Sequence, residues 1–544
     1  MDQSTAAAPS GHVDPFARAH LPPPELWPEL LFDLPELRYP PRLNCVAELL
    51  DRHVAAGQGA RPALCDEHER WTYAQLQQQV DRIAHVLRGR LGLVPGNRVL
   101  LRGANTPLMA AAILAVLKAG LIAVPTMPLL RTRELGTIIA KAQVDAVLCA
   151  ASLRAELDAV PGLPPAVYFG PGADDASSLE ALMAQAPAAF EACDTAADDV
   201  CLISFTSGTT GVPKGTMHFH RDVLAICDCF PRHTLRTQPS DLFIGTPQLA
   251  FTFGLGGLLL FPLRVGACAV LLEKLTPETL LQAIARHRAT VCFTAPTFYR
   301  QMAPLAARYD LSSLRATVSA GEALPVATRD AWQRATGLAM IDGIGSTEML
   351  HIFISAAGAD IRPGATGKPV PGYQACILDA QGKPVGPGVV GRLAVKGPTG
   401  CRYLADPRQK DYVCDGWNLT GDAYEMDADG YFIYRSRTDD MIISAGYNIA
   451  GPEVEDALLR HPAVAECGVV GRDDEERGQV VEAHVVLRPG FDGTPALAAE
   501  LQEFVKSSIA PYKYPRRVLF APALPRTETG KLQRFRLRDA GAAT

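Results

Sequence analysis

Short apolar runs alternate with longer amphipathic stretches along the first 300 residues of the chain. An apolar run at 99–103 precedes a helical pattern at 107–119, which ends at Gly120, and a second apolar run follows at 121–125. Such short, continuous apolar runs are typical of parallel strands that helices cover on both faces. The pattern recurs, and it predicts further strands at 145–150, 201–205, 268–272 and 290–294 and further helices at 131–142 and 276–288.

Two longer apolar stretches approach the length of a membrane span. Residues 109–130 are interrupted by Lys118 and Pro125, and residues 254–272 are interrupted by Pro262. A spanning helix needs about 20 predominantly apolar residues. Each stretch is therefore predicted to be a buried helix that leads into a buried strand, and we expect no membrane partner.

The pattern changes along the rest of the chain. Residues 151–200, rich in Ala, Pro, Gly and Asp, are expected to form a surface segment. After about residue 360 the sequence predicts a small β-rich part, and beyond the polar stretch RTDD at 437–440 it predicts a further α/β unit, so this stretch is the candidate domain boundary. The elements predicted here are strands at 373–379, 391–397, 430–436, 466–471 and 482–488 and helices at 452–460 and 497–508.

Composition and charge narrow the class of protein. The 544 residues are 48% hydrophobic and 20% charged, which is typical of a folded protein of two or three domains. The net charge of −6 gives no electrostatic reason for a nucleic-acid partner. The amino terminus lacks the basic and apolar segments of a secretion signal, so a cytoplasmic location is expected.

The 13 cysteines are scattered singly except for Cys227 and Cys229, and no disulfide framework is predicted. This pair lies near His218 and His220, but the spacing matches no standard zinc pattern. Buried cysteines commonly serve as small apolar side chains, so we assign no metal to these four residues.

The segment TSGTTGVPKG at 206–215 has the composition of a phosphate-binding loop. Its glycines allow backbone N–H groups to converge, and its hydroxyls and Lys214 add further donors. It does not match the Walker pattern, because Pro213 precedes the lysine and Gly215 stands where Ser or Thr is required. The loop alone could also be an ordinary surface turn.

Five further motifs follow this loop in the chain. With it, they resemble, in order and approximate spacing, the motifs of the adenylate-forming superfamily, which includes acyl-CoA synthetases, adenylation domains and luciferases. The resemblance extends from about residue 45 to the end, and AFTFGLGG at 250–257 and GIGSTEMLHIF at 343–353 resemble benzoate-CoA and 2-aminobenzoate-CoA ligases. The five motifs are SAGEALP at 319–325, DGIGSTE at 342–348, LTGD at 419–422, YRSRTDDMIISAGYNI at 434–449 and PRTETGK at 525–531.

The resemblance implies an α/β fold of two domains. A large N-terminal domain at 1–438 would bind acid and ATP, and it would contain two mostly parallel α/β sheets and a small β-barrel-like subdomain. A small, mobile α+β domain at 439–544 would form a lid, with the hinge at Asp439. An ordinary solvated linker carboxylate is the alternative interpretation of Asp439.

The resemblance also implies an ATP and Mg²⁺ site. Catalysis is assigned to Lys531, Glu348, Thr206 and Lys214, with Glu348 holding Mg²⁺ and Lys531 lying between the acid carboxylate and the α-phosphate. Asp422 and Arg437 would contact the ribose. The other nucleotide-binding residues form the mobile loop over the outer phosphates and the adenine pocket, and they are Ser207, Gly208, Thr209, Thr210, Gly211, Gly321, Glu322, Ala323, Asp342, Gly343, Ile344, Gly345, Ser346 and Thr347.

The site assignments each have a plainer alternative. Asp422 could cap a turn, and Arg437 and Lys531 could be ordinary surface side chains. At Ile344 many members of the superfamily have an aromatic residue that stacks on adenine, so the position of that stack is open here. Taken together, the ordered motifs favour the nucleotide site.

The reaction implied has two steps. The carboxylate attacks the α-phosphate of ATP, which gives an acyl-adenylate and pyrophosphate, and the thiolate of coenzyme A then displaces AMP. Rotation at the hinge would withdraw Lys531 and bring in residues 444–448. Gly446 and Tyr447 are accordingly assigned to the coenzyme A side.

The acid pocket is expected to be flat and apolar. Thr252 and His351 could each pair with an ortho amino group, which favours 2-aminobenzoate over benzoate. The phenylalanines could instead belong to the ordinary core. The residues assigned to the pocket are Phe251, Thr252, Phe253, Ala320, Gly321, His351 and Ile352.

Other functions remain open at this point. They are a benzoate-CoA ligase, a medium-chain acyl-CoA synthetase, an aryl adenylation enzyme that loads a carrier protein, and a nucleotide-binding scaffold with an inactive site. The expected partners are a small aromatic acid and coenzyme A, and the sequence is compatible with a monomer or a homodimer.

Overall fold

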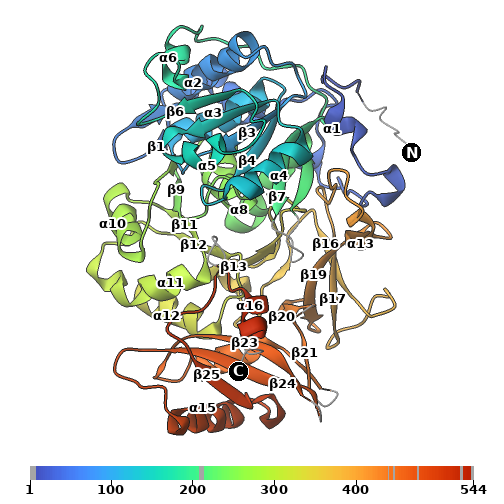
Figure 1. The fold of residues 1–544 in the computed structure, drawn as a ribbon, viewed down its shortest axis with the longest axis vertical. Coiled ribbons are helices and arrows are strands. Elements are labelled where there is room, and N and C mark those ends of the chain that lie inside the picture. The colour runs from blue at the N-terminus through green and yellow to red at the C-terminus, as the bar shows by residue number, and fades with distance from the viewer. Residues whose placement is uncertain are drawn as a thin grey trace.

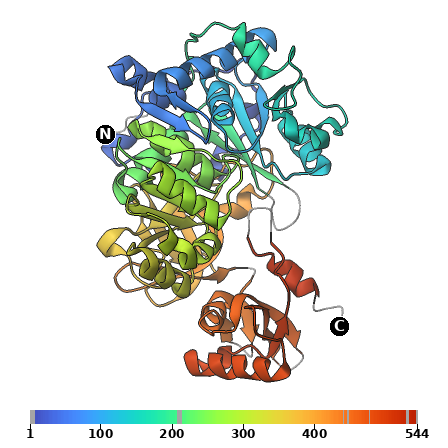
Figure 2. The same cartoon turned by 90° about the vertical axis from the view of Figure 1, so that its left-hand side faces the viewer.

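The computed structural model describes residues 8–206, 213–438, 440–444, 447–474, 477–526 and 531–540. Figure 1 shows the N-terminal half at the top of the molecule and the last 100 residues at its lower end. The view in Figure 2 shows that this C-terminal part stands apart below the remainder.

A six-stranded sheet forms the upper layer of Figure 1, with strand order β6-β5-β3-β4-β7-β8. All neighbours are parallel except β7 and β8, which form an antiparallel pair. The strands are β3 (Arg98–Arg102), β4 (Ile122–Thr126), β5 (Ala146–Ala150), β6 (Ala166–Phe169), β7 (Val200–Thr206) and β8 (Lys214–Phe219), and the helices between the first three are α3 (Pro107–Lys118) and α4 (Thr132–Ala142).

Helix α3 shows how local sequence sets an element. Its side chains are buried almost throughout, as the apolar stretch predicted. Thr106 accepts a hydrogen bond from the Met109 N–H, and Pro107 occupies the first turn, where its missing N–H costs nothing. The predicted buried helix therefore leads directly into the buried strand β4.

A second, nine-stranded sheet has the order β15-β14-β13-β12-β11-β9-β10-β1-β2. The strands from β1 to β13 along this order are parallel, and β2, β14 and β15 are antiparallel to their neighbours. The strands are β1 (Pro62–Cys65), β2 (Arg70–Thr72), β9 (Leu242–Gly245), β10 (Cys268–Val270), β11 (Val291–Thr294), β12 (Ala316–Ala320), β13 (Met340–Gly345), β14 (Ile352–Ser355) and β15 (Lys368–Pro369).

The helices around this sheet agree with the predicted alternation. Residues 254–272 form consecutive helical turns that lead into β10, and the predicted helix at 276–288 is α10 (Pro277–His287). Thr276 caps α10 by accepting a hydrogen bond from the Thr279 N–H. The other helices used below are α7 (His220–Asp228), α8 (Thr252–Leu255), α9 (Phe261–Val265), α11 (Pro296–Met302) and α12 (Val326–Thr336).

Two smaller sheets complete the fold. The first is antiparallel and consists of β16 (Gln374–Leu378), β17 (Val390–Lys396), β18 (Val413–Cys414), β19 (Trp417–Met426) and β20 (Phe432–Arg437). The second consists of β21 (Ile442–Ser444), β22 (Tyr447–Ile449), β23 (Val464–Asp474), β24 (Gly478–Leu487) and β25 (Arg517–Phe520), with helices α14 (Gly451–Leu458), α15 (Pro495–Ser508) and α16 (Arg534–Ala540). The predicted fold class, two mostly parallel sheets with a small β subdomain and an α+β C-terminal part, is confirmed.

Several strands were not predicted from the sequence, among them β8, β9, β12, β13, β14 and β19, and two further regions also differ. Residues 151–200 are more than a surface segment, because they supply the edge strand β6 and helix α6 (Leu179–Ala184), with Val167 and Phe169 buried. A four-residue edge strand among Ala, Pro and Gly gives a weak periodic signal. Residues 62–85, to which we assigned no element, form β1, β2 and helix α2 (Tyr73–His85).

Within the described ranges, no helix is both long enough and apolar enough to cross a lipid bilayer.

Candidate active site

Glu348 lies three residues beyond the end of β13 and is only 7% exposed. The hydroxyl of Tyr403 donates a hydrogen bond to its Oε1 at 2.5 Å. Lys214, the first residue of β8, donates from Nζ to the same hydroxyl at 2.8 Å, and its Nζ is 3.7 Å from Glu348 Oε1. The lysine, the phenol and the carboxylate therefore form one connected group that fixes the position of Glu348.

The protonation state of Tyr403 follows from its surroundings. Burial raises the pKa of its phenol, and the neighbouring Glu348 carboxylate raises it further. The phenol accordingly stays protonated and acts as a donor to Glu348. Lys214 Nζ also lies 4.8 Å from the centre of the Tyr403 ring, which adds a cation–π contact.

The residues just before Glu348 are also anchored. Ser346 Oγ accepts a hydrogen bond from the Met349 N–H at 3.2 Å and lies 3.3 Å from the Tyr412 hydroxyl. The Thr347 carbonyl is 2.9 Å from His218 Nε2. These contacts hold the turn that carries the hydroxyls toward the predicted phosphate site.

Only part of the predicted phosphate loop can be placed. Thr206 ends β7, and its Oγ1 is buried with no hydrogen-bond partner in the part of the chain that the structure describes. Lys214 begins β8 on the other side of the loop. The other predicted loop residues, Ser207, Gly208, Thr209, Thr210 and Gly211, lie outside the described residues.

Asp422 and Arg437 form a cross-strand pair on β19 and β20. Arg437 donates from one terminal guanidinium nitrogen to Asp422 Oδ1 at 3.0 Å, and also to the Thr420 carbonyl at 3.1 Å. Burial raises the pKa of Asp422, although Arg437 opposes this effect. Gly421 has φ +75°, and a Cβ there would lie 2.7 Å from the Arg437 guanidinium, so this glycine allows the pair to form.

The predicted adenine pocket follows the carboxyl ends of β12 and β13. Gly321 has φ +90° and turns the chain just after β12. Desolvation raises the pKa of Asp342 to about 7, in spite of the nearby Arg329. Ile344, partly buried, pairs with Ile354 of β14, so it presents an aliphatic surface at the predicted adenine pocket.

Lys531 reaches this region from the C-terminal part of the chain. Its Cε lies 3.9 Å from the position that a Cβ on Gly321 would occupy. Desolvation lowers the pKa of the Lys531 ammonium, while the Asp422 and Glu322 carboxylates oppose the shift and Glu348 adds a smaller opposing contribution. Part of the side chain stays accessible to solvent, so the lysine is positioned at an open site.

Glu322 connects the two parts of the molecule. It accepts a hydrogen bond from Arg526 at 3.3 Å and one from Thr297 Oγ1 at 2.7 Å. Arg526 also donates to Glu466 of β23 at 2.9 Å, and the Val326 N–H donates to Asp456 of α14 at 2.9 Å. These contacts hold the C-terminal sheet against the loop after β12, which is the arrangement that keeps Lys531 at the site.

His351 lies at the centre of the predicted acid pocket. It is 3% exposed, and among the described residues both ring nitrogens are buried without a partner at good hydrogen-bonding geometry, although the Phe253 backbone lies near enough to oppose the effect of burial on its pKa. Desolvation lowers the pKa of the imidazole to about 3, so the ring is neutral at physiological pH. Four phenylalanines surround it, with ring centres 4.5 to 6.5 Å away: Phe261, Phe253, Phe230 and Phe293.

The other predicted pocket residues gather around the same ends of strands. Phe251 and Thr252 start α8, and Phe253 packs on Phe293 with ring centres 5.5 Å apart. A Cβ on Gly256 would come within 2.5 Å of the His351 ring, so this glycine makes room for the histidine. Ala320 and Ile352 are both buried, at the end of β12 and the start of β14.

Of the residues predicted to bind coenzyme A, Tyr447 is not part of the site that the structure assembles. Tyr447 is 54% exposed on β22, and its ring stacks on that of Tyr512 with centres 4.6 Å apart. The predicted hinge residue Asp439 and the neighbouring Gly446 lie outside the described residues. The structure therefore brings Lys531 to the nucleotide side and leaves Tyr447 on an exposed face.

Sequence reasoning missed several residues that shape the site. Tyr403, which holds Glu348, stands in no recognised motif, and nothing in its sequence surroundings marks it. Arg526 lies within PRTETGK, next to the predicted lysine, so its motif could have identified it. Phe230, Phe261 and Phe293 come from three separated segments and meet only in the folded chain.

A buried carboxylate just beyond a parallel strand, a second buried carboxylate on β19 and a lysine from the C-terminal part of the chain can together bind a nucleotide and neutralise charge on its phosphates. The fold and the site thus define a nucleotide-binding enzyme of the adenylate-forming class. More specifically, the chain belongs to the family described as AMP-binding enzyme, whose profile matches residues 51–403, and the profile of the AMP-binding enzyme C-terminal domain matches residues 453–531. The predicted superfamily and enzymatic nature are confirmed.

Several relatives match over almost their full length. A benzoate–CoA ligase of Thauera aromatica is 37% identical over 519 residues, which cover 93% of this chain and 98% of the relative. The structure of the anthranilate CoA ligase AuaEII in complex with anthranoyl-AMP superposes with a TM-score of 0.88 at 34% identity, covering 94% of this chain and all of that one. A benzoate CoA ligase from Burkholderia xenovorans LB400 superposes with a TM-score of 0.84 at 33% identity, covering 91% of this chain and all of that one.

Proposed function

We propose that the protein is an ATP-dependent acid–thiol ligase that converts 2-aminobenzoate to its CoA thioester, with release of AMP and pyrophosphate. The observation that carries the choice of acid is the neutral, unpartnered imidazole of His351 inside an enclosure of phenylalanine rings. Aromatic and apolar walls favour a flat aromatic acid, and an ortho amino group would pair with the imidazole. The structure of AuaEII, a relative described as an anthranilate CoA ligase, supports this choice.

The charged residues are suited to the first step of that reaction. Attack of a carboxylate on the α-phosphate brings two anions together, and this requires neutralisation and alignment more than covalent help. Lys531 would supply the positive charge, and its lowered pKa reflects the desolvation that strengthens such a contact. Asp422 and Arg437 would position the ribose between Lys531 and the adenine pocket.

The residues around Glu348 fit a magnesium ion. The donor set consists of a buried carboxylate and the hydroxyls of Ser346 and Thr347, and a hard dication prefers oxygen ligands. When bound, the ion would neutralise charge on the phosphate oxygens. Tyr403 and Lys214 would hold the carboxylate in place for this task.

We also propose that the protein consists of a domain at 1–438 and a lid at 439–544, and that the lid rotates at Asp439 between the two half-reactions. The exposed Tyr447 would then approach the site together with Gly446 to receive coenzyme A.

The variant Asp439→Pro tests this hinge, because proline restricts the backbone there. It should leave acid-dependent ATP–pyrophosphate exchange near the wild-type rate and lower thioester formation by about 10²-fold. Equal loss in both assays would argue against the hinge.

The acid is tested with a panel of carboxylates, assayed by AMP release with coenzyme A. The expected result is a kcat/KM for 2-aminobenzoate about 10-fold above that for benzoate, because benzoate leaves the His351 nitrogen unpaired. His351→Leu should abolish this preference and retain benzoate activity, whereas His351→Gln, which keeps a donor and an acceptor, should retain it. A strong benzoate preference in the wild type would overturn the choice of acid.

Benzoate is the second candidate, because the Thauera aromatica and Burkholderia xenovorans relatives are both described as benzoate CoA ligases. The same panel includes hexanoate and octanoate, which test the medium-chain alternative, and a carrier protein in place of coenzyme A tests the carrier-loading alternative. Lack of pyrophosphate exchange with every acid would favour a scaffold.

A further inference from the structure

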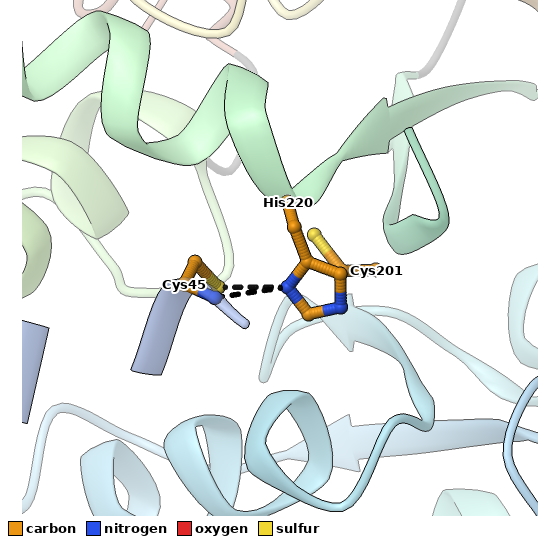
Figure 3. A group of neighbouring side chains, drawn as sticks. All are labelled: Cys45, Cys201 and His220. Carbon is orange, nitrogen blue, oxygen red and sulfur yellow. Dashed lines mark hydrogen bonds between the residues drawn. The ribbon is translucent and has the colours of Figure 1, made fainter. Parts of the chain in front are cut away.

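Three buried side chains from distant parts of the chain meet beside the six-stranded sheet (Figure 3). Cys45 precedes the first long helical segment, Cys201 lies on β7, and His220 is the first residue of α7. One ligand atom from each residue lies within 4.8 Å of the other two, and all three side chains are fully buried. Two sulfurs and an imidazole in this arrangement form the donor set that zinc commonly takes.

The hydrogen bonding of His220 is incomplete in this buried place. Nδ1 lies 3.2 Å from the Cys45 backbone N–H nitrogen and 3.2 Å from Cys45 Sγ, and it can serve one of them at a time. Nε2 is buried and has no partner among the described residues. Buried polar groups are almost always paired, so this ring is under-satisfied as it stands.

Both cysteines can serve as ligands only after they lose their protons. A thiolate is the form of cysteine that binds metal.

We propose that Cys45, Cys201 and His220 bind a structural Zn²⁺ ion. The two thiols release their protons to solvent, and each sulfur and the neutral imidazole donate a lone pair to the ion. Two thiolates and one dication sum to zero charge, which suits a fully buried site. Zn–S and Zn–N bonds of about 2.3 and 2.0 Å place ligand atoms about 3.6 Å apart, so small side-chain rotations from the observed spacing suffice.

Cys45, Cys201 and His220 fill three of the four positions of a tetrahedral site.

The position of the site indicates what the ion would do. β7 and β8 form an antiparallel pair in which Val200 faces Phe219, so Cys201 and His220 lie at the end of the pair opposite the loop at 207–212. Zinc would tie this end to the segment around Cys45. It would stabilise the support of the predicted phosphate loop without touching substrate.

The cluster differs from the one that the sequence suggested and we rejected. His218 points to the Thr347 carbonyl, and the Cys227 thiol donates to the Val223 carbonyl. His220 thus meets two cysteines that are 175 and 19 positions away in the sequence, a combination that motif spacing does not reveal.

The site is tested on the whole protein. Because the ligands are buried, metal is supplied during folding, by expression in medium supplemented with Zn²⁺ or, in a second preparation, with Co²⁺. The expected result is about one zinc per chain after purification, and thiolate-to-cobalt charge-transfer absorption in the cobalt preparation. Wild-type protein that carries neither metal would overturn the proposal, whatever the variants do.

Variants locate the metal. Cys201→Ala and His220→Asn should each lower the zinc content at least several-fold and lower Tm. The matched control Cys227→Ala, which removes another buried thiol from the helix that carries His220, should keep the full zinc content. Equal zinc content in Cys201→Ala and Cys227→Ala would show that the ion binds elsewhere. If Cys201→Ala does not fold, the cobalt spectrum of the wild type decides the question.

Discussion

The two halves of the site are built in opposite ways. On the nucleotide side the charged groups are matched: Glu348 with Tyr403 and Lys214, and Asp422 with Arg437. On the acid side a single polar ring, His351, lies unpartnered among phenylalanines. The nucleotide side is a set of charged groups that hold one another in position. The acid side is an apolar enclosure that contains one polar group, the imidazole of His351.

The difference reflects what each half must recognise. A nucleotide brings several charges, so its site needs groups whose positions are fixed before binding. A small acid differs from its analogues by one substituent, and one unsatisfied buried group is enough to discriminate between them. Mutations on the nucleotide side should therefore change the rate with every acid, and mutations of His351 should change the choice of acid.

The largest effect is expected for Lys531→Ala. Removing the cation should lower acid-dependent ATP–pyrophosphate exchange by about 10³-fold, because the α-phosphate then lacks its neutralising charge. Thioester formation from a synthetic acyl-adenylate should change little, since the proposed rotation at the hinge withdraws this lysine before that step. Lys506→Ala, on helix α15 of the same C-terminal part, is the control and should behave as wild type in both assays.

The loss in Lys531→Ala should be the same for 2-aminobenzoate and for benzoate. A loss confined to one acid would mean that the lysine belongs to the acid side, and the division of the site into two halves would fail.

Glu348→Gln should have the next largest effect. The amide keeps the shape of the side chain but removes the negative charge that a magnesium ion requires. Exchange activity should fall by about 10²-fold at saturating ATP, and the Mg²⁺ concentration for half-maximal activity should rise. The measurement is a magnesium titration of pyrophosphate exchange. An unchanged titration curve would exclude Glu348 as the metal ligand.

The contrast between the halves also explains what could be predicted from the sequence. Lys531, Asp422 and Glu348 stand in compact motifs, and the order of those motifs along the chain identified the superfamily, although no strand was predicted directly before them. The environment of His351 depends on Phe230 and Phe293, which lie more than 50 residues from it and from each other. Long-range packing of that kind leaves no local pattern, as the missed strand β6 shows for the fold itself.

Titration of His351 gives a prediction about stability. Its pKa is about 3 in the folded protein and 6.5 in the unfolded chain. Below pH 6.5 the unfolded chain therefore takes up a proton that the folded protein does not, so the free energy of unfolding falls as the pH is lowered from 7 toward 3. At pH 5 the loss from this residue should be about 2 kcal/mol relative to pH 8.

The measurement is denaturant unfolding of wild type and His351→Gln at both pH values. The wild type should lose about 2 kcal/mol more than the variant, because His218 and His12, whose pKa values are also lowered by burial, act equally in both proteins. Parallel pH dependences would show that His351 is solvated, and the acid side would then lack the unpartnered group on which the comparison depends.

The smallest effect is expected for Tyr403→Phe. The variant keeps the ring under Lys214 but removes the hydroxyl that joins the lysine to Glu348. Since one hydrogen bond to a charged group is lost while the ion pair remains, exchange activity should fall by about 5-fold, and equally for every acid in the panel. Lys214→Ala should reduce exchange activity by a larger factor than Tyr403→Phe does. In the double variant the reduction should be smaller than the product of the two single reductions, because both residues act through the same carboxylate. Fully multiplicative losses would mean that Lys214 and Tyr403 act independently, and the nucleotide side would then be a collection of separate contacts instead of one connected group.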